Sequence, residues 1–307
     1  MSRLDDVLKG ATFLEKTAGT NPHQMVQMTY ADPGTGKTVL TAKLAQRLRS
    51  DTGRILFLDS MEGFVTLEEH PELVKGMIRV RVDNPRDLVP IADGLQRNVA
   101  KLKSVEVVIL DEYSSWVKRI AEAYVRDLHN TDPGDMMPTI EGHDWGPIGA
   151  LAGAILTQFI ASGRHVLIVA HSRLRGGDDD NGGKGGKFTP NFTPLLGLDI
   201  QGMVHQTTLM TARLAGRGQY ERTLHTRPSA SIQAKSRVEG MPMNPTEKQF
   251  LDLTAGWAHG TVGTAKPVTA ARAARTKAPE VTVPADAPLE GDESLDLEDQ
   301  PVPADED

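Results

Sequence analysis

The sequence predicts an α/β fold in which a mainly parallel sheet is covered by helices on both faces. Short, nearly continuous apolar runs alternate with longer stretches that repeat apolar residues at helical spacing, which is typical of a parallel sheet buried on both sides. A glycine-rich loop joins the first apolar run to the first helical stretch. Late in the chain, β-like runs follow one another directly, which predicts antiparallel strands added to the sheet.

The expected elements follow in chain order. A β-prone run at 25–30 ends in the glycine-rich loop, and a helix is expected at 37–50. Further strands are expected at 54–59, 77–82, 105–110 and 165–170. The helices between them are expected at 85–103, 114–128 and 145–162. The later β-like runs lie at 203–213, 219–225 and 230–235, with Gly216-Arg217-Gly218 as a hairpin turn.

Charge is distributed unevenly along the chain. The formal net charge is −7, but residues 281–307 contain ten Asp and Glu and no Lys or Arg. Removing these ten negative charges leaves residues 1–280 at about +3. The acidic stretch and the Ala/Pro-rich stretch before it contain too few aromatic and β-branched residues to offset the entropy of ordering. The sequence therefore predicts an N-terminal segment at 1–21, a core at 22–257 and a disordered tail at 258–307.

The composition excludes several classes of function. The chain has no cysteine, which rules out disulfides, thiolate metal sites and cysteine nucleophiles. It has no apolar run of 18 or more residues, and residues 1–6 lack the order of a signal peptide, basic and then apolar. We therefore expect a cytoplasmic protein without a membrane partner.

The glycine-rich loop matches the phosphate-binding motif G-x-x-x-x-G-K-[ST] at every position except the first, where alanine replaces glycine. In such a loop several backbone N–H groups point at one anion, and a helix N-terminus lies behind them. Lys37 is expected to contact the β and γ phosphates of ATP, and the Thr38 hydroxyl to ligate Mg²⁺. The predicted nucleotide-binding residues are Ala31, Asp32, Pro33, Gly34, Thr35, Gly36, Lys37 and Thr38.

Acidic residues follow two of the expected strands. Asp111 comes directly after the run at 105–110 and is expected to hold Mg²⁺ together with Thr38. Hydrolysis also needs a carboxylate that orients and polarises the attacking water. Glu112 follows Asp111 directly, and Glu62 follows the second strand, so both are candidates for this base.

A loop rich in glycine, cations and phenylalanine follows the strand at 165–170. Such side chains suit contacts with a nucleic-acid backbone and stacking on its bases. A plain surface loop is the alternative, and the aspartates at 178–180 argue against purely electrostatic binding. Trp145, at the start of a helix, is either a core anchor or a stacking platform. The predicted DNA-binding residues are Arg173, Arg175, Lys184, Lys187 and Phe188.

Together these motifs resemble the phage RecA-core P-loop ATPases, a group of AAA-domain nucleotide-binding proteins related to single-strand annealing recombinases. The resemblance covers about 22–257, and its most specific parts are the phosphate loop and Asp111. It implies a DNA-stimulated ATPase that binds single-stranded DNA in recombination, by annealing or strand pairing, and assembles into a filament or ring. It also implies a phage gene acting in a bacterial cytoplasm, and a tail that serves a single-strand-binding protein.

The resemblance also implies roles for individual residues. RecA-like proteins place the base in an acidic segment after the second strand, which favours Glu62, although this segment is one residue longer here. AAA+ ATPases place the base where Glu112 lies. His171 would sense the γ phosphate. Lys235 and Arg237, on one face of a late strand, would act on the nucleotide of a neighbouring subunit.

Other functions fit the same motifs. An AAA+ ATPase that remodels a protein, or loads a replicative helicase, predicts Glu112 as the base and a helical lid after the core, whereas 203–237 look β-rich. A ring helicase shares the core, but the chain shows no obvious separate N-terminal assembly domain. A nucleotide-binding scaffold requires that neither glutamate supports hydrolysis.

Overall fold

The computed structural model describes residues 23–261, except 133, 176–185, 193 and 216–219. The described residues all lie within one unit of the chain, Met1–Lys266. Four predictions fall outside these residues: the segment at 1–21, Lys184, the turn at 216–218 and the tail beyond Thr261.

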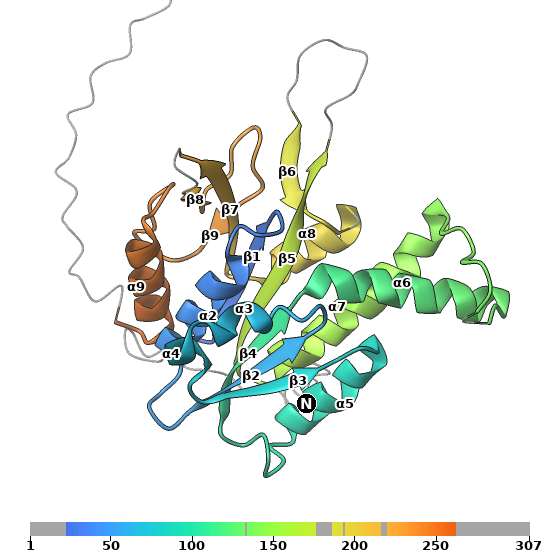
Figure 1. Ribbon diagram of the computed structural model, residues 1–307, viewed down its shortest axis with the longest axis horizontal. Helices are drawn as coiled ribbons and strands as arrows, with labels where there is room; N and C mark the ends of the chain where they lie inside the picture. The colour runs from blue at the N-terminus through green and yellow to red at the C-terminus, as the bar shows by residue number, and fades with distance from the viewer. Residues whose placement is uncertain (1–22, 133, 176–185, 193, 216–219, 262–307) are drawn as a thin grey trace, which may run out of the picture. The chain divides into compact units, whose positions relative to one another are not determined.

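A central sheet organises the described residues (Figure 1). Seven strands follow the order β3-β2-β4-β5-β1-β7-β8. The first six of these run parallel, and β8 is antiparallel to β7. The bounds are β1 Val26–Ala31, β2 Arg54–Asp59, β3 Met77–Arg81, β4 Val105–Asp111, β5 His165–Arg175, β7 Gln206–Leu214 and β8 Tyr220–His225. Two short strands, β6 (Lys187–Pro190) and β9 (Lys235–Ser236), pair antiparallel with β5 and β7 respectively. The predicted mainly parallel sheet with added antiparallel strands is confirmed.

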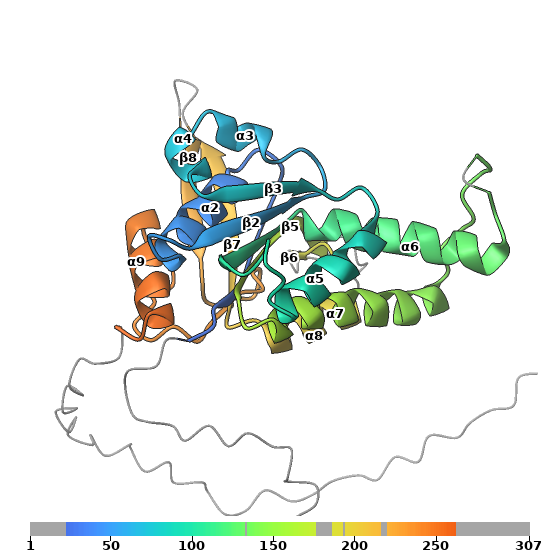
Figure 2. The ribbon, with the colours of Figure 1, turned by 90° about the horizontal axis from the view of Figure 1, so that it is seen from below.

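Helices cover both faces of this sheet, as Figure 2 shows. Side chains of α2 (Lys37–Leu48), α3 (Val65–Glu68), α4 (Pro71–Val74) and α9 (Glu247–Ala258) enter the apolar core on one face. Those of α5 (Leu88–Gln96), α6 (Tyr113–His129), α7 (Trp145–Ala161) and α8 (Pro194–Met203) enter the core on the other. Short 3₁₀ turns at Pro85–Asp87 and Gly142–Asp144 precede α5 and α7. No helix in the described ranges is long and apolar enough to span a membrane.

Strand β4 illustrates why the strands read as continuous apolar runs. Val107 and Ile109 lie in one core, and Val108 and Leu110 lie in the other. Successive side chains of a strand point to opposite faces, so both sets must be apolar when both faces are covered. All four side chains are fully buried.

Several predicted boundaries are wrong, and four helices were not predicted: the short α3 and α4, and the longer α8 and α9. The helix expected at 85–103 ends at Gln96, because Asn98 adopts a left-handed φ of 52° and the Val99 N–H returns to the Gly94 carbonyl. The strand expected at 203–213 begins at Gln206, after the unforeseen α8. The unforeseen α9 starts with a capping box formed by Thr246 and Gln249.

The β-like run at 230–235 forms a strand only at Lys235–Ser236. Its earlier backbone groups are bonded individually. The Gln233 N–H donates to the Phe188 carbonyl, and the Gln233 carbonyl accepts from the Tyr30 hydroxyl. The loop expected after residue 170 is partly regular, because β5 continues to Arg175 and pairs with β6.

The strand order fixes where a ligand would bind. After β1 the chain crosses to β2 on one side of β1, and after β5 it reaches β7 on the other side. In open parallel sheets such a reversal opens a crevice at the carboxyl ends of the strands. The carboxyl ends of β1 and β4 carry the predicted phosphate loop and Asp111, and His171 lies beside them where β5 leaves the parallel part of the sheet.

Candidate active site

The phosphate loop joins β1 to α2 in the predicted way. Gly34 and Gly36 have φ angles of 76° and 95°, which glycine adopts without strain. Lys37 is the first residue of α2, so the helix N-terminus opens directly onto the loop. Ala31 is the fully buried last residue of β1, and alanine fits this extended position.

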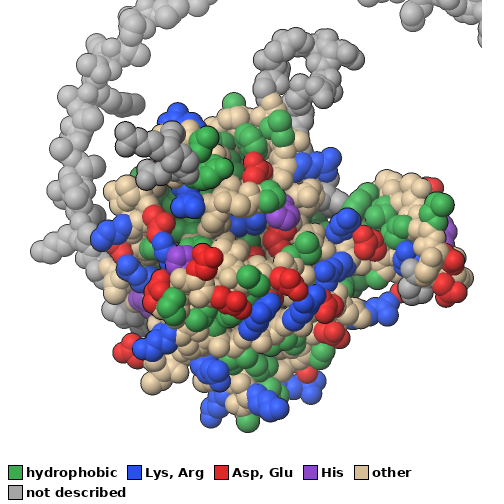
Figure 3. Space-filling model, viewed as in Figure 1, with side chains coloured by type: hydrophobic (Ala, Val, Ile, Leu, Met, Phe, Trp, Pro, Cys, Tyr) green, Lys and Arg blue, Asp and Glu red, His purple; other side chains and the backbone are tan. Residues whose placement is uncertain are grey.

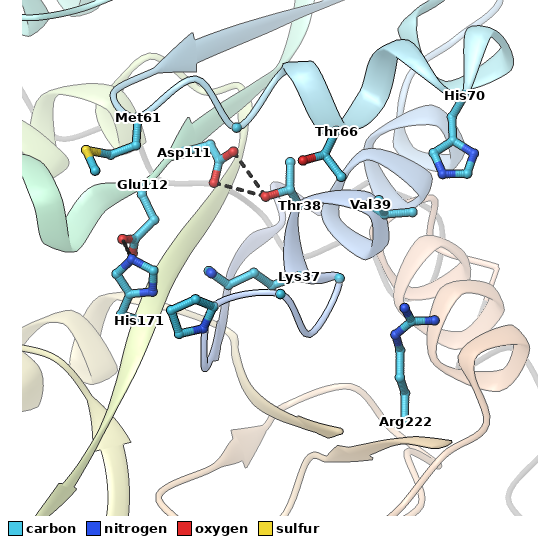
Figure 4. A pocket seen from close by; sticks show the side chains of 14 residues that line it. Lys37, Thr38, Val39, Met61, Thr66, His70, Asp111, Glu112, His171 and Arg222 are labelled. Atoms are coloured by element: carbon cyan, nitrogen blue, oxygen red, sulfur yellow. Dashed lines mark hydrogen bonds and ion pairs between the residues drawn. The ribbon is translucent and has the colours of Figure 1, made fainter. Parts of the chain in front are cut away.

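A cavity of about 360 Å³ lies in front of this loop (Figure 4). Its walls come from the phosphate loop with the start of α2, the segment that leads from β2 through α3 to α4, the end of β4, His171 of β5, and strand β8. The side chains with polar chemistry in it include Lys37, Thr38, Asp111, Glu112, His171 and Arg222.

Thr38 and Asp111 meet on one side of the cavity. The Thr38 hydroxyl donates to the Asp111 carboxylate, with Oγ1 3.1 Å from Oδ2. Burial and then the neighbouring Glu112 raise the pKa of Asp111 to about 7, while the Lys37 charge opposes this rise. A hydroxyl and a buried carboxylate that lacks an arginine partner are suitable ligands for Mg²⁺, which takes its other ligands from phosphate and water. The residues present therefore fit the metal that the motif implies.

Glu112 lies beside Asp111 and faces the same cavity. Its carboxylate is held at both oxygens, by the Ser114 hydroxyl at Oε1 (2.5 Å) and by His171 Nε2 at Oε2 (2.5 Å). Its backbone N–H donates to Ser60 Oγ (2.8 Å), and the Asp111–Glu112 peptide bond is cis. Only 6 % of the side chain is exposed, so this carboxylate is positioned rather than free in solvent.

His171 lies where the sequence places it, at the edge of the cavity. It pairs with Ala31 in the β1–β5 register, one strand away from Glu112. Its Nε2 contacts Glu112, whereas its buried Nδ1 has no hydrogen-bond partner among the described residues. The imidazole thus connects β5 to the candidate base.

Residues 23–238 match the family model of an AAA domain. The chain belongs to this family. The match confirms a P-loop ATPase domain of the AAA type, whereas the narrower phage RecA-like assignment stays a prediction. A comparison with curated proteins finds no match.

The two candidate bases of this AAA domain have very different surroundings. Glu62 sits on a turn with φ of 60°, its side chain is 58 % exposed, and it pairs with Arg81 of the edge strand (2.5 Å). Its neighbours Met61 and Gly63 line the cavity instead. The carboxylate of Glu62 is therefore directed to the Arg81 side chain and is not part of the cavity wall. The geometry therefore favours Glu112, against the preference derived from the sequence.

The predicted trans-acting cations lie away from this cavity. Lys235 pairs with Thr207 near the amino end of β7, and the Arg237 N–H donates to the His205 carbonyl just before that strand. The phosphate loop lies at the opposite edge of the sheet, where Ala31 pairs with Met210. Lys235 Nζ donates to the Gln201 carbonyl, and burial followed by the Arg237 charge lowers its pKa.

Arg222 is a cavity residue that was not singled out in the sequence. Strands β7 and β8 extend past the edge of the parallel sheet, and this hairpin brings Arg222 to the phosphate loop. Its Nε donates to the Thr35 carbonyl (2.7 Å). An arginine on an isolated β-like run gives no signal in the sequence, because only the pairing with β7 shows where it points.

The predicted DNA-binding residues lie on the β5–β6 hairpin. Arg173 is exposed, and Phe188 is half-buried against the core. Arg175 pairs with Lys187 in the hairpin register, although the side chain of Arg175 is not among those described. A second cavity, of about 560 Å³, lies beside the hairpin and is lined by Arg173, Lys118, Trp145, Asn191, Phe192 and Ser114, among others.

Proposed function

We propose that this AAA domain hydrolyses Mg·ATP with Glu112 as the base and couples turnover to single-stranded DNA in recombination. One observation carries the proposal. The carboxylate of Glu112, which lines the phosphate cavity, contacts His171 of β5 and accepts a hydrogen bond from Ser114. Ser114 also lines the cavity beside the β5–β6 hairpin.

The chemistry follows from the charges in the first cavity. Lys37 supplies a cation at the helix N-terminus, where phosphate oxygens would accumulate negative charge. Thr38 and Asp111 would hold Mg²⁺, which neutralises phosphate charge. The Glu112 carboxylate would orient a water molecule and accept its proton.

The hairpin supports a nucleic-acid partner. Single-stranded DNA is bound by cations that follow the backbone and by flat side chains that stack on bases. The second cavity combines Arg173 and Lys118 with the ring of Trp145. Acidic and basic side chains are interspersed over the face in Figure 3, so local contacts at the hairpin, rather than a long-range field, would recognise the strand.

A direct connection joins the hairpin to the phosphate loop. Ser172, one residue after His171, donates to the carboxylate of Asp32 in the loop. β5 carries His171, Ser172 and Arg173 in succession. Single-stranded DNA bound at Arg173 would therefore act both on the catalytic base Glu112, through His171, and on the phosphate loop, through Ser172. This arrangement supports stimulation of hydrolysis by DNA.

The assembly is part of the same proposal. Lys235 and Arg237 lie at the amino edge of the sheet, so they would reach a nucleotide only in a neighbouring subunit of a filament or ring. The acidic tail would serve a single-strand-binding protein, and the gene would belong to a phage. These statements rest on the resemblance given above.

A protein-remodelling ATPase is the second candidate function. It is favoured by α9, a helix beyond the matched AAA domain that packs on α2, where an AAA+ lid would begin. This candidate shares Glu112 as the base and differs in what stimulates turnover.

The test measures phosphate release by the full chain with Mg·ATP, with and without single-stranded DNA. We expect single-stranded DNA to raise the rate at least several-fold, and Arg173→Ala to reduce this stimulation while keeping the basal rate. Arg97→Ala, which removes an exposed arginine from the end of α5, is the matched control. Hydrolysis that is insensitive to DNA would contradict the DNA coupling and leave the remodelling ATPase.

A further inference from the structure

A third cavity, of about 260 Å³, adjoins the phosphate cavity. Four residues line both of them: Gly36, Val39, His70 and Arg222. Because they share these walls, we treat the two adjoining cavities as the two halves of one groove along the first turn of α2.

The two halves of the groove differ in chemistry. The first half contains the charged groups that suit phosphates. The second half is lined by apolar side chains of Val39, Leu40 and Met210, and the Lys43–Glu247 ion pair (2.7 Å) lies at its wall. A nucleoside triphosphate has the same division, since a flat, largely apolar base is joined to a charged chain.

Two flat side chains stand on either side of the apolar half. Figure 4 shows His70, which precedes α4, and Arg222 of β8 pointing toward one another across Val39. Imidazole and guanidinium groups both stack on nucleobases, and a cation over a π-system adds electrostatic attraction. The described side chains thus provide two stacking partners over an apolar floor.

Arg222 is anchored but not neutralised. Its Nε donates to the Thr35 carbonyl, and no carboxylate in the described ranges forms an ion pair with it. A Cβ atom at Gly36 would lie 3.2 Å from Arg222 Nε, so the loop glycine also leaves room for the guanidinium. The remaining guanidinium nitrogens and the flat face of the group are left for a ligand.

We propose that this apolar half is the nucleoside subsite of the ATPase, with the base held between His70 and Arg222 above Val39 and Met210. The proposal rests on the nucleotide binding described above and adds the residues that recognise the base. It also gives the β7–β8 hairpin a role, because this hairpin brings Arg222 to the site.

The test compares a probe that contains a nucleoside with a triphosphate probe that lacks one. A non-hydrolysable ATP analogue and inorganic tripolyphosphate are each titrated into the full chain at constant Mg²⁺. We expect His70→Ala and Arg222→Ala each to weaken binding of the analogue by about 5- to 50-fold, the loss typical of one stacking partner. Tripolyphosphate binding should change by less than about threefold for His70→Ala, and by clearly less than analogue binding for Arg222→Ala.

Two conservative variants and two controls sharpen the test. His70→Phe keeps a ring and should retain analogue binding, whereas Arg222→Lys keeps the charge but loses the flat group and should not. Arg213→Ala and His143→Ala remove exposed side chains of the same types, 81 % and 74 % exposed, and should bind both probes normally.

The outcomes separate this inference from the proposed function. Wild-type protein that binds neither probe would overturn both. Wild-type binding combined with unchanged analogue affinity in the His70 and Arg222 variants would overturn the nucleoside subsite alone. Equal losses for both probes would also overturn it, since the two residues would then act on the phosphates.

Discussion

β2 and β4 are neighbouring parallel strands, and each ends in a buried aspartate that is followed by a glutamate. Asp59 and Asp111 are paired in the sheet register. Asp59 is neutralised within the chain, because Arg79 donates to it from Nε and Nη2 (3.1 and 2.9 Å) and the Gly63 N–H adds a third hydrogen bond (3.0 Å). Asp111 instead contacts the neutral hydroxyl of Thr38.

The two glutamates, Glu62 and Glu112, differ in their exposure and in their partners. Glu62 is exposed and paired with Arg81, so its charge is already satisfied at the surface. Glu112 is buried and bonded to Ser114 and His171, which leave its carboxylate beside the phosphate loop. A buried acid without a fixed cation is costly unless a ligand or metal supplies the charge. The acids at the carboxyl end of β2, Asp59 and Glu62, are each paired with an arginine of the chain, whereas Asp111 and Glu112 at the end of β4 are not paired with one among the described residues. We therefore assign a structural role to the segment after β2 and a catalytic role to the segment after β4.

The largest expected effect comes from exchanging each glutamate for its amide. Glu112→Gln should lower the rate of ATP hydrolysis by about 10²- to 10⁴-fold and keep ATP binding, because the amide cannot accept a proton. Glu62→Gln, its matched control, should stay within about threefold of wild type. Phosphate release and equilibrium ATP binding measure both variants. Loss of turnover only in Glu62→Gln would reverse the assignment.

Substitution of Asp111 should affect activity, whereas substitution of Asp59 should affect stability. Asp111→Asn should remove most Mg²⁺-dependent hydrolysis while the ligand-free protein keeps or gains stability, because a desolvated charge is lost. Asp59→Asn should lower the free energy of unfolding by roughly 2–4 kcal/mol, because the buried partner of Arg79 is removed. Urea denaturation of both variants, with hydrolysis measured at saturating Mg²⁺, gives the comparison. Equal destabilisation of the two variants would contradict it.

A substitution at Gly63 tests how closely the segment after β2 approaches Asp111 at the end of β4. A Cβ atom there would lie 2.2 Å from Asp111 Oδ2, so Gly63→Ala must displace the carboxylate or the loop. We expect hydrolysis to fall about tenfold, which corresponds to ~1.4 kcal/mol. A Cβ at Gly134 would meet nothing within 4 Å, so Gly134→Ala is the control. Normal turnover by Gly63→Ala would show that the approach is not needed.

The smallest effect is expected at Ser60, which connects the segments. Ser60 Oγ accepts a hydrogen bond from the buried backbone N–H of Glu112 (2.8 Å). Ser60→Ala leaves this donor unpaired and should lower the free energy of unfolding by about 1–2 kcal/mol. Chemical denaturation measures this loss, with the exposed Ser231→Ala as the control. A change no larger than that of the control would argue against the connection.

The sequence predicted what depends on local pattern. The phosphate loop, Asp111 and the parallel strands were identified because a motif and an apolar run each carry their own signal. The position of His171 followed from its place directly after the apolar run at 165–170, although β5 continues to Arg175. These predictions needed no knowledge of which residues meet across the fold.

The sequence could not decide what depends on pairing between distant segments. Glu62 and Glu112 are equivalent as sequence, and the difference lies in Arg81, Ser114 and His171, which reach them from other elements. Arg222 lies 187 residues along the chain from Thr35, whose carbonyl it contacts. Only the extension of β7 and β8 past the sheet edge brings it there.

The edge strand β3 carries one further consequence. Arg79 and Arg81 stand at alternate positions of the terminal strand, and they serve Asp59 and Glu62 respectively. An unpaired edge strand is also a template on which other chains can add strands, and charged side chains discourage such aggregation. Arg79 and Arg81, which neutralise Asp59 and Glu62, thus also discourage other chains from pairing with β3. Replacing them would weaken the fold and leave an edge strand that promotes aggregation.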